Sequence, residues 1–444
     1  MDVAADTADA GGVNPHYLNH VVATSAAHEV RTTEDIVSGS GVKLLAKGAR
    51  IDHSMRDRLL QHKLQKPLED CVQVVGGVVP ACFGPIADEL LAQHALLASL
   101  CDSGRALAVP ASLTQLPLAL PVQSLLTVYC DYQGDRLRHT VGVAMLALAL
   151  GRRLFPGDID RHRRLALAGL VHDVGELYID PAHLQRGTRL QPEQWRHIVS
   201  HPVIGHRVLK DMEGAGPQVA QAVLLHHERL NGFGYPRGIG GAAVQLDGQV
   251  LGVAEWLMAL IESGLTPLAR ASVACRLIPG DFAGAIVETI DEAARALDAG
   301  APGVDAPTPL EAAVPRVMRI ASTIKRFVQQ RAWIDARIAA ARGPLRQVLQ
   351  SGLQRMLRIQ TAFSSTGLDS GDPELLLREL SAMGDPQVHV EVMTVIGELE
   401  WRLRELERES LLRGSLGDPS DDAVMVELVN RLRPPAAAPT SRPA

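Results

Sequence analysis

Apolar residues recur every three or four positions through the central part of the chain, in short segments separated by Gly, Pro and charged residues. This spacing is typical of one face of an α-helix and not of a half-buried strand. It predicts short helices that include DRLRHTVGVAMLALALGRRL, RHRRLALAGLVHDVGEL, PQVAQAVLLHHERL and QVLGVAEWLMALI. We therefore expect an all-helical central domain over residues 121–298.

The N-terminal part has a different pattern. Over residues 28–51, short β-type runs alternate with Gly-Ser and Lys-Gly turns, which predicts a small hairpin. Asp52 then precedes a helical segment as its candidate N-cap. We expect a small α+β accessory domain over residues 15–105. A disordered segment at 1–14 precedes it, and a linker interrupted by prolines follows at 106–120.

Two apolar seams with three-four spacing run through the C-terminal part. They consist of Val317, Ile320, Ile324, Phe327, Ile334 and Ile338, and of Val392, Ile396, Leu399, Leu403 and Leu406. The seams predict a helical region at 310–414 that forms an antiparallel helical pair, a coiled coil or a dimer interface, with packing inside one chain as the alternative. A Gly- and Pro-rich linker is expected at 299–309, and a mostly disordered tail at 415–444. The fold class is mainly α.

Composition excludes some classes of function. The chain of 444 residues has a net charge of -6 with neutral histidines, which does not suggest a nucleic-acid-binding protein, because such proteins usually have a basic face. The scattered cysteines form no metal-binding spacing. The most apolar long window, 106–126, is broken by prolines and is a poor membrane span. With no signal-peptide pattern at the N-terminus, a cytoplasmic protein of two or three domains is the simplest interpretation.

Histidines and carboxylates recur along the predicted central helices. In chain order they are Asp135, His139, His172, Asp173, His201, His226, His227 and Glu255. One histidine on an apolar face is usually a core residue, but several on consecutive helices, with interleaved carboxylates, are hard to explain by packing. Asp135 and His139 are four residues apart, so they share a helix face.

Mixed nitrogen and oxygen ligands suit Fe, Mn or Zn better than Ca or Mg. A carboxylate can bridge two metals while imidazoles complete the coordination of each. Two metals held about 3.5–4 Å apart can share a hydroxide and clamp a phosphoryl group. The pattern therefore predicts a two-metal hydrolytic site.

The chain resembles a known family at five segments. They are HT (139–140), LVHDVGEL (170–177), HPVIGHRVL (201–209), HHERLNGFGYPRGI (226–239) and LGVAEWLMAL (251–260). In order and approximate spacing they are similar to HD-GYP domains, a branch of the HD-domain phosphohydrolases. The resemblance covers residues 121–298. It implies an all-helical fold, two or three Fe or Mn ions, and hydrolysis of cyclic di-GMP to pGpG and on to GMP in bacterial second-messenger signalling.

The resemblance also implies roles for individual residues. The implied metal ligands are His139, His172, Asp173, His201, His226 and His227, with His172 and Asp173 as the catalytic pair and Asp173 as the bridge. Asp135 lies where three-metal members have a glutamate and is one carbon shorter, so it is the candidate ligand for a third ion beside the two. Gly234, Tyr235 and Pro236 form the GYP loop at the rim, a segment implicated in protein contacts. The candidate basic residues for phosphate are Arg186, Arg237 and Arg270.

Several positions depart from the family pattern. Glu255 occupies the final ligand position, where the family has aspartate, and Glu176 replaces the usual lysine. Two unit charges 4 Å apart interact by roughly 4 kcal/mol at an effective dielectric constant of about 20, so a carboxylate there would repel a phosphate. Alternatively, Glu176 adds a metal ligand or is exposed and inert. Thr266 and Ala269 replace two basic residues.

Three hypotheses follow. The first is a metal-dependent cyclic di-GMP phosphodiesterase. The second is a non-catalytic relative that keeps the metal ligands and serves as a signalling scaffold or receptor, with partners at the GYP loop and a dimer through the C-terminal helices. The third is a phosphohydrolase of a different nucleotide, since the missing basic residues concern the substrate and not the metal.

Overall fold

The computed structural model describes residues 12–102, 104, 107–132, 134–184, 192–262, 271, 280–298, 310–369, 372–415 and 419–433. The chain divides into two compact units. Unit 1 comprises Met1–Pro267 and Gly280–Ala299, and unit 2 comprises Leu268–Pro279 and Gly300–Ala444. The predicted linker at 299–309 lies outside the described residues. The predicted linker at 106–120 falls inside unit 1 and contains a short helix, α5 (Val109–Thr114).

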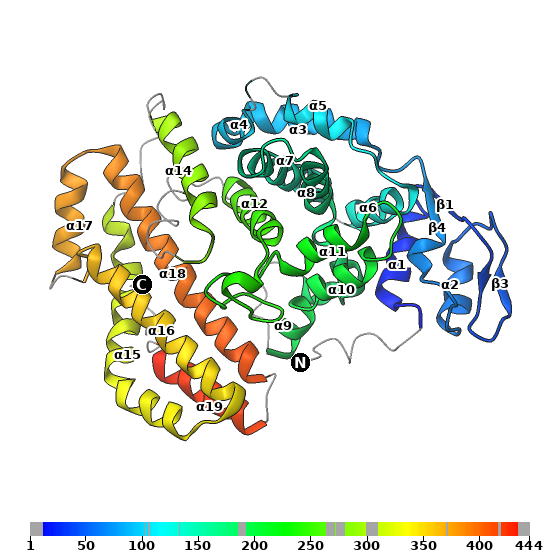
Figure 1. Ribbon diagram of the computed structural model, residues 1–444. Coiled ribbons are helices and arrows are strands. Elements are labelled where there is room, and N and C mark those ends of the chain that lie inside the picture. The colour runs from blue at the N-terminus through cyan, green and yellow to red at the C-terminus, as the bar shows by residue number, and fades with distance from the viewer. Residues whose placement is uncertain are drawn as a thin grey trace, which may run out of the picture. The chain divides into compact units, whose positions relative to one another are not determined.

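The N-terminal part of unit 1 mixes short helices and strands (Figure 1). Its other helices are α1 (Pro15–Thr24), α2 (His53–Leu60), α3 (Phe83–Gln93) and α4 (Ala95–Cys101), with 3-10 turns at Leu68–Asp70 and Pro80–Cys82. Strand β1 (Glu29–Thr32) pairs antiparallel with β4 (Val72–Val75), and β2 (Ile36–Val37) pairs with β3 (Lys43–Leu45). The expected α+β character and hairpin are confirmed.

Side-chain caps fix where these helices begin. The Asn14 carboxamide oxygen accepts hydrogen bonds from the backbone N–H groups of His16 (2.9 Å) and Tyr17 (3.0 Å) at the start of α1. Asp52 accepts one from Ser54 N–H (2.9 Å) at the start of α2, as the sequence predicts. Each such cap satisfies donors that a helix N-terminus otherwise leaves unpaired.

His20 of α1 is buried against the edge of the Tyr132 ring, with centroids 4.3 Å apart. Burial lowers the pKa of His20 to about 4. Between pH 6.5 and 4 the unfolded chain therefore binds a proton that the folded chain does not, so the free energy of unfolding falls as the pH falls through this window.

Urea unfolding at pH 7, 5.5 and 4.5 measures this loss of stability at His20. We expect wild type to lose more stability between pH 7 and 4.5 than His20→Phe does. Equal losses would contradict the lowered pKa of His20.

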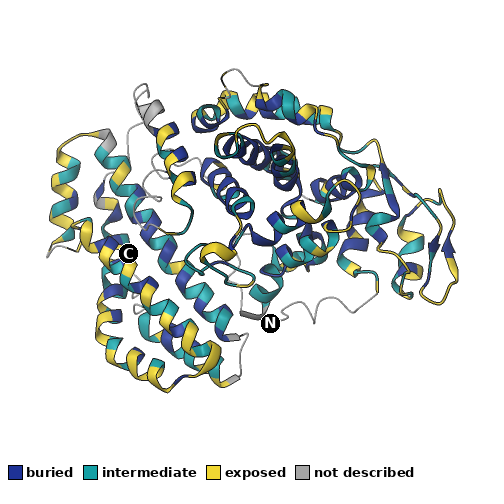
Figure 2. Cartoon of the chain, viewed as in Figure 1, coloured by how far each residue is buried: buried dark blue, intermediate teal, exposed yellow. Residues whose placement is uncertain are grey.

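The central part of unit 1 is helical, as expected. Its helices are α6 (Leu120–Tyr132), α7 (Arg136–Leu154), α8 (Ile159–Val171), α9 (Pro192–Ile198), α10 (His201–Leu209), α11 (Gly216–Leu225), α12 (Leu246–Glu262) and α14 (Gly284–Asp298), with 3-10 turns at Val174–Tyr178 (η3), Pro181–His183 and Gly241–Ala243. Helix α7 is buried from Thr140 to Gly151 and packs against α8 and α12 (Figures 1 and 2). Helices α7, α8 and α12 thus form the core of the domain, and several of the candidate histidines lie at helix ends packed against this core.

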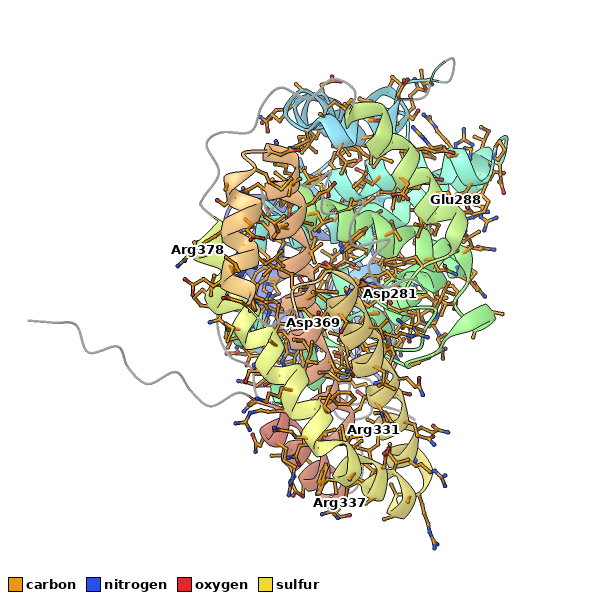
Figure 3. All side chains as sticks on the ribbon, turned by 90° about the vertical axis from the view of Figure 1, so that its left-hand side faces the viewer. Asp281, Glu288, Arg331, Arg337, Asp369 and Arg378 are labelled. Carbon is orange, nitrogen blue, oxygen red and sulfur yellow. The ribbon has the colours of Figure 1, made fainter. Side chains whose placement is uncertain are left out.

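Unit 2 is a helical bundle built from α15 (Val314–Ala340), α16 (Gly343–Ser365), α17 (Pro373–Ala382), α18 (Pro386–Ser415) and α19 (Pro419–Leu432), preceded by a 3-10 turn at Leu310–Ala313. The apolar seam of α15 packs within the chain against α16, α18 and α19. The Arg331 and Arg337 side chains of α15 (Figure 3) are 41% and 44% exposed, and Arg337 pairs with Glu427 of α19. The alternative of packing inside one chain therefore accounts for these seams.

The prediction of a mostly disordered tail at 415–444 is wrong over Pro419–Leu432, which forms α19. Met425, Leu428 and Val429 follow helical spacing and are buried in the core of the bundle. Asp421 and Asp422 lie in the first turn, where carboxylates interact favourably with the helix dipole. None of the helices in the described residues is both long and apolar enough to cross a membrane.

Candidate metal centre

The ligand-type residues lie at the ends of helices that meet closely. His172 follows the last residue of α8, Asp173 precedes η3, and His201 begins α10. A side chain at Gly175 would place its Cβ 2.1 Å from the His201 carbonyl oxygen. Only glycine therefore lets the segment after Asp173 approach α10 so closely, and this approach brings Asp173 to His201.

Helix α12 also approaches the end of α11 closely, at Gly252. His226 and His227 follow α11, and a Cβ at Gly252 would lie 2.1 Å from the His226 carbonyl oxygen. The missing side chain lets α12 lie against the end of α11. Glu255, almost one turn further along α12, then reaches the histidines. Its carboxylate oxygens lie 3.7 Å from His226 Nε2 and 3.6 Å from His227 Nε2.

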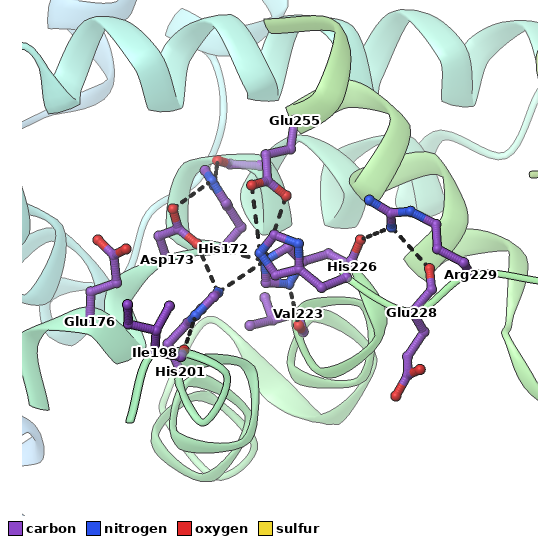
Figure 4. Close-up of polar contacts among 12 residues, drawn as sticks. His172, Asp173, Glu176, Ile198, His201, Val223, His226, Glu228, Arg229 and Glu255 are labelled. Atoms are coloured by element: carbon purple, nitrogen blue, oxygen red, sulfur yellow. Dashed lines mark hydrogen bonds and ion pairs between the residues drawn. The ribbon is translucent and has the colours of Figure 1, made fainter. Parts of the chain in front are cut away.

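Two groups of ligand atoms result, and Figure 4 shows Asp173 among His172, His201 and His226. Asp173, His201, His226 and His227 each offer an atom within 4.8 Å of the others, and so do His139, His172 and Asp173. Asp173 belongs to both groups. Its two oxygens lie 3.2 Å from His172 Nε2 and 3.2 Å from His201 Nε2. A carboxylate in this position can bridge two cations.

Backbone carbonyls fix the imidazole tautomers. The Nδ1 atoms of His172, His201 and His226 lie 2.9, 2.7 and 2.5 Å from the carbonyl oxygens three residues earlier. Each Nδ1 is therefore the protonated nitrogen, and each Nε2 faces the cluster with a lone pair. This arrangement is typical of metal-ligating histidines, whose second nitrogen donates to a carbonyl or carboxylate.

The facing lone pairs need a cation. His201 Nε2 and His226 Nε2 are 3.3 Å apart, and both face the Asp173 carboxylate, at 3.2 and 3.6 Å. Two lone pairs beside a carboxylate repel one another unless a proton or a metal ion lies among them. His172 Nε2, Asp173 Oδ1 and Glu255 Oε2 are also buried without a hydrogen-bond partner among the described residues. The residues present therefore fit a divalent metal centre.

The electrostatics agree with this fit. Burial raises the pKa of Asp173, but the neighbouring imidazoles outweigh it and hold that pKa well below the ordinary value. Burial lowers the pKa of His172, yet the Asp173 charge raises it to about 9. For His227, burial and then the charge of His226 lower the pKa. The ionised Asp173 and the neutral His227 are suitable donors for a cation, and a metal ion bound at His172 would displace the proton that Asp173 stabilises there.

The environment of His139 differs from the expected one. Asp135 precedes α7 and belongs to neither ligand group. Instead, Glu262 at the end of α12 places Oε1 2.9 Å from His139 Nδ1. The sequence gives no signal for this contact, because the two residues are more than a hundred positions apart. Glu262 is thus the carboxylate that the structure places beside His139.

The GYP loop covers one side of the histidines. The Tyr235 ring stacks on the His227 ring with centroids 4.4 Å apart, and Tyr235 N–H donates to the His227 carbonyl at 3.1 Å. Gly234 is buried, and the Tyr235–Pro236 peptide bond is cis. The Arg237 side chain is exposed. The loop therefore contributes an aromatic wall to the site.

Glu228 organises this loop, a role that its position in the sequence does not indicate. It is 1% exposed, and its carboxylate accepts hydrogen bonds from the backbone N–H groups of Arg237 (2.7 Å) and Ile239 (3.1 Å). The neighbouring Arg229 donates to the carbonyls of His226 and Glu228, each at 3.0 Å (Figure 4). An acidic residue directly after two histidines suggests a further ligand, but its carboxylate points to the loop backbone.

We expect Glu228→Ala to destabilise the chain, because it leaves two loop N–H groups unpaired at a cost of about 1–3 kcal/mol each. Urea unfolding measures the loss. Glu213→Ala, at an exposed position, is the matched control and should leave the midpoint unchanged. Equal midpoints for the two variants would contradict the role given to Glu228.

Glu176 is neither exposed nor inert. Its carboxylate forms an ion pair with Arg136 of α7, and the two side chains are 16% and 14% exposed. Arg136 also donates to the Tyr129 hydroxyl and lies over the Tyr129 ring, 4.5 Å from its centroid. Burial and the Asp173 charge raise the pKa of Glu176, while Arg136 opposes them. The negative charge at this position is therefore offset by a cation from another helix.

Four residues named in the sequence analysis lie outside the described residues. They are Arg186, Thr266, Ala269 and Arg270. Their suggested roles remain predictions.

Comparison with known proteins places the site in a family context. A family model described as HD domain matches residues 123–278. A 3'3'-cGAMP-specific phosphodiesterase 1 of Vibrio cholerae is 32% identical over 126 residues, covering 28% of this chain and 29% of that protein. A 3'3'-cGAMP-specific phosphodiesterase 3 of the same organism is 24% identical over 253 residues, covering 53% and 55%. A cyclic di-GMP phosphodiesterase of Pseudomonas aeruginosa is 34% identical over 108 residues, covering 24% and 26%. The chain thus spans between about a quarter and about half of the length of these relatives.

Proposed function

We propose that the chain is a metal-dependent phosphodiesterase of a cyclic dinucleotide, and the HD-domain family model that matches residues 123–278 supports this proposal. The observation that carries the proposal is the arrangement of lone pairs around Asp173. Three histidines present Nε2 toward the cluster, with Nδ1 held by a backbone carbonyl, and Asp173 belongs to both ligand groups. When bound, divalent metal ions supply an activated hydroxide and stabilise charge on a phosphoryl group.

The chain's own residues have distinct roles in this proposal. Asp173, which belongs to both ligand groups, would be shared between two ions, and His172 with Asp173 would form the catalytic pair. His139, His201, His226, His227 and Glu255 complete the ligand set. Since Asp135 belongs to neither group, we propose two ions, Fe or Mn, as suits mixed nitrogen and oxygen ligands. In this proposal a substrate base or ribose would pack against Tyr235, whose ring stacks on His227.

We propose cyclic di-GMP as a substrate, in bacterial second-messenger signalling, with pGpG and GMP as products. The similarity to phosphodiesterases named for 3'3'-cGAMP makes that dinucleotide the second candidate. The test is chromatography of the products after anaerobic incubation with Mn or Fe, with each dinucleotide in parallel. We expect a linear dinucleotide and then a mononucleotide from at least one of them. Metal-loaded protein that leaves both intact would contradict the proposal.

The scaffold hypothesis predicts a different outcome of the same experiment. A degenerate receptor would bind metal and dinucleotide without turnover. The ion pair of Glu176 with Arg136 argues against this hypothesis, because the carboxylate charge that would repel phosphate is offset. The cytoplasmic location, a partner at the GYP loop and a dimer through the C-terminal helices stay predictions.

A further inference from the structure

Unit 2 contains a cavity of about 310 Å³ lined by residues of α15, α16, α18 and α19. Its walls are mainly apolar and include Ile320, Phe327, Ile334, Leu349, Met356 and Leu428. An apolar cavity of about 150 Å³ already accepts benzene, and pockets for small molecules begin at about 300 Å³. The size and lining of this cavity therefore suit a small apolar ligand.

Gly352 marks open space in the wall. It lies within helix α16 and lines the cavity, and a Cβ built on it would meet no atom within 4 Å. Glycine within a helix is destabilising relative to alanine because it loses more conformational freedom on folding. A helix that served packing alone would gain from a side chain here. The absent side chain instead enlarges the cavity.

The cavity lining contains more arginines than glutamates. Arg319 pairs with Glu400 (3.4 Å), and Arg433 donates to Glu407 (2.8 Å). Arg404 also lines the cavity; it is exposed and forms no hydrogen bond or ion pair with the described residues. One guanidinium group is therefore left without a carboxylate.

A hydroxyl group accompanies this cation on the cavity wall. Ser410 of α18 lines the cavity, is 7% exposed and has no hydrogen-bond partner among the described residues. The Ser410 hydroxyl can therefore donate a hydrogen bond to an acceptor atom inside the cavity. A free guanidinium and a free hydroxyl on one helix favour an anionic oxygen over a cation.

We propose that this cavity binds a single-chain amphiphile with an anionic head group. The apolar chain lies among the aliphatic and aromatic walls, and the head group interacts with Arg404 and Ser410. This site is separate from the metal centre and does not depend on the proposed hydrolysis.

Isothermal titration calorimetry on the full chain tests the proposal with three probes of equal chain length: decanoate, decanol and decyltrimethylammonium. We expect decanoate to bind with one site per chain, and roughly 10-fold more tightly than decanol, as an ion pair worth about 1.4 kcal/mol would give. The cationic probe should bind more weakly than decanol. Equal binding of all three would overturn the anionic preference.

Gly352→Leu locates the site. We expect it to abolish decanoate binding, while Gly352→Ala, the matched control for helix propensity, retains it. Circular dichroism should show both variants folded, with melting points at or above that of wild type. Leu428→Phe fills the cavity from the opposite helix and serves if Gly352→Leu does not fold. Unchanged decanoate affinity in a folded filling variant would overturn the proposal.

Arg404→Gln tests the head-group contact. It should remove the preference for decanoate over decanol, while Arg378→Gln, at an outward-facing position on α17 (Figure 3), should preserve it. Light scattering tests whether a second copy of the chain fills the cavity instead of an amphiphile. A dimeric mass in wild type that is lost in Gly352→Leu would show that a second copy fills the cavity, and would overturn the proposal.

Discussion

Asp173→Asn is expected to abolish metal binding and hydrolysis together. The carboxylate belongs to both ligand groups, and an amide supplies neither its charge nor a second anionic oxygen. Removal of mere outer partners of metal ligands typically costs 10–100-fold in metal affinity or activity, so loss of the bridge should lower the rate by at least about 100-fold.

Elemental analysis and the hydrolysis rate of the same samples measure this effect. Asp211→Asn is the matched control, because Asp211 is 83% exposed and pairs only with Lys210 (3.5 Å) among the described residues. A variant at Asp173 that retained metal and activity like the control would show that the bridge lies elsewhere.

Glu176→Lys is expected to destabilise the chain rather than restore a family-like site. The new ammonium group would lie against the Arg136 guanidinium, which is 14% exposed and loses its carboxylate partner. Breaking a buried ion pair by removing one partner typically costs about 3–5 kcal/mol, because a buried charge is left uncompensated. Any gain in phosphate attraction would be masked by partial unfolding.

Urea unfolding measures how much the ion pair of Arg136 with Glu176 stabilises the fold. The double variant Arg136→Glu with Glu176→Lys reverses the pair and should recover part of the stability. Glu213→Lys, at an exposed position, should have almost no effect. If Glu176→Lys unfolds at the same urea concentration as wild type, then the ion pair does not support the fold.

The sequence predicts which histidines and carboxylates gather where short motifs lie at helix ends. His172, Asp173, His201, His226 and His227 all reach the two ligand groups, because each lies beside a helix end that a glycine or a close packing contact brings inward. The helical domain is predictable for the same reason, since its apolar spacing is regular.

Partners that come from distant elements are not predictable in this way. Glu262 meets His139, and Arg136 meets Glu176, only because α7 packs against α12 and near η3. The carboxylate of Glu228 is taken up by loop N–H groups, which no spacing rule indicates. For α19, the proline- and alanine-rich end of the chain obscured a helical apolar pattern at Met425, Leu428 and Val429.

The most direct test of the central claim is the rate of cyclic dinucleotide hydrolysis as metal-free chain is titrated anaerobically with Mn. The two ligand groups that share Asp173 predict that hydrolysis appears only with metal and reaches its plateau near two equivalents per chain. Hydrolysis that survives without metal, or full metal loading with no turnover of either dinucleotide, would contradict the account.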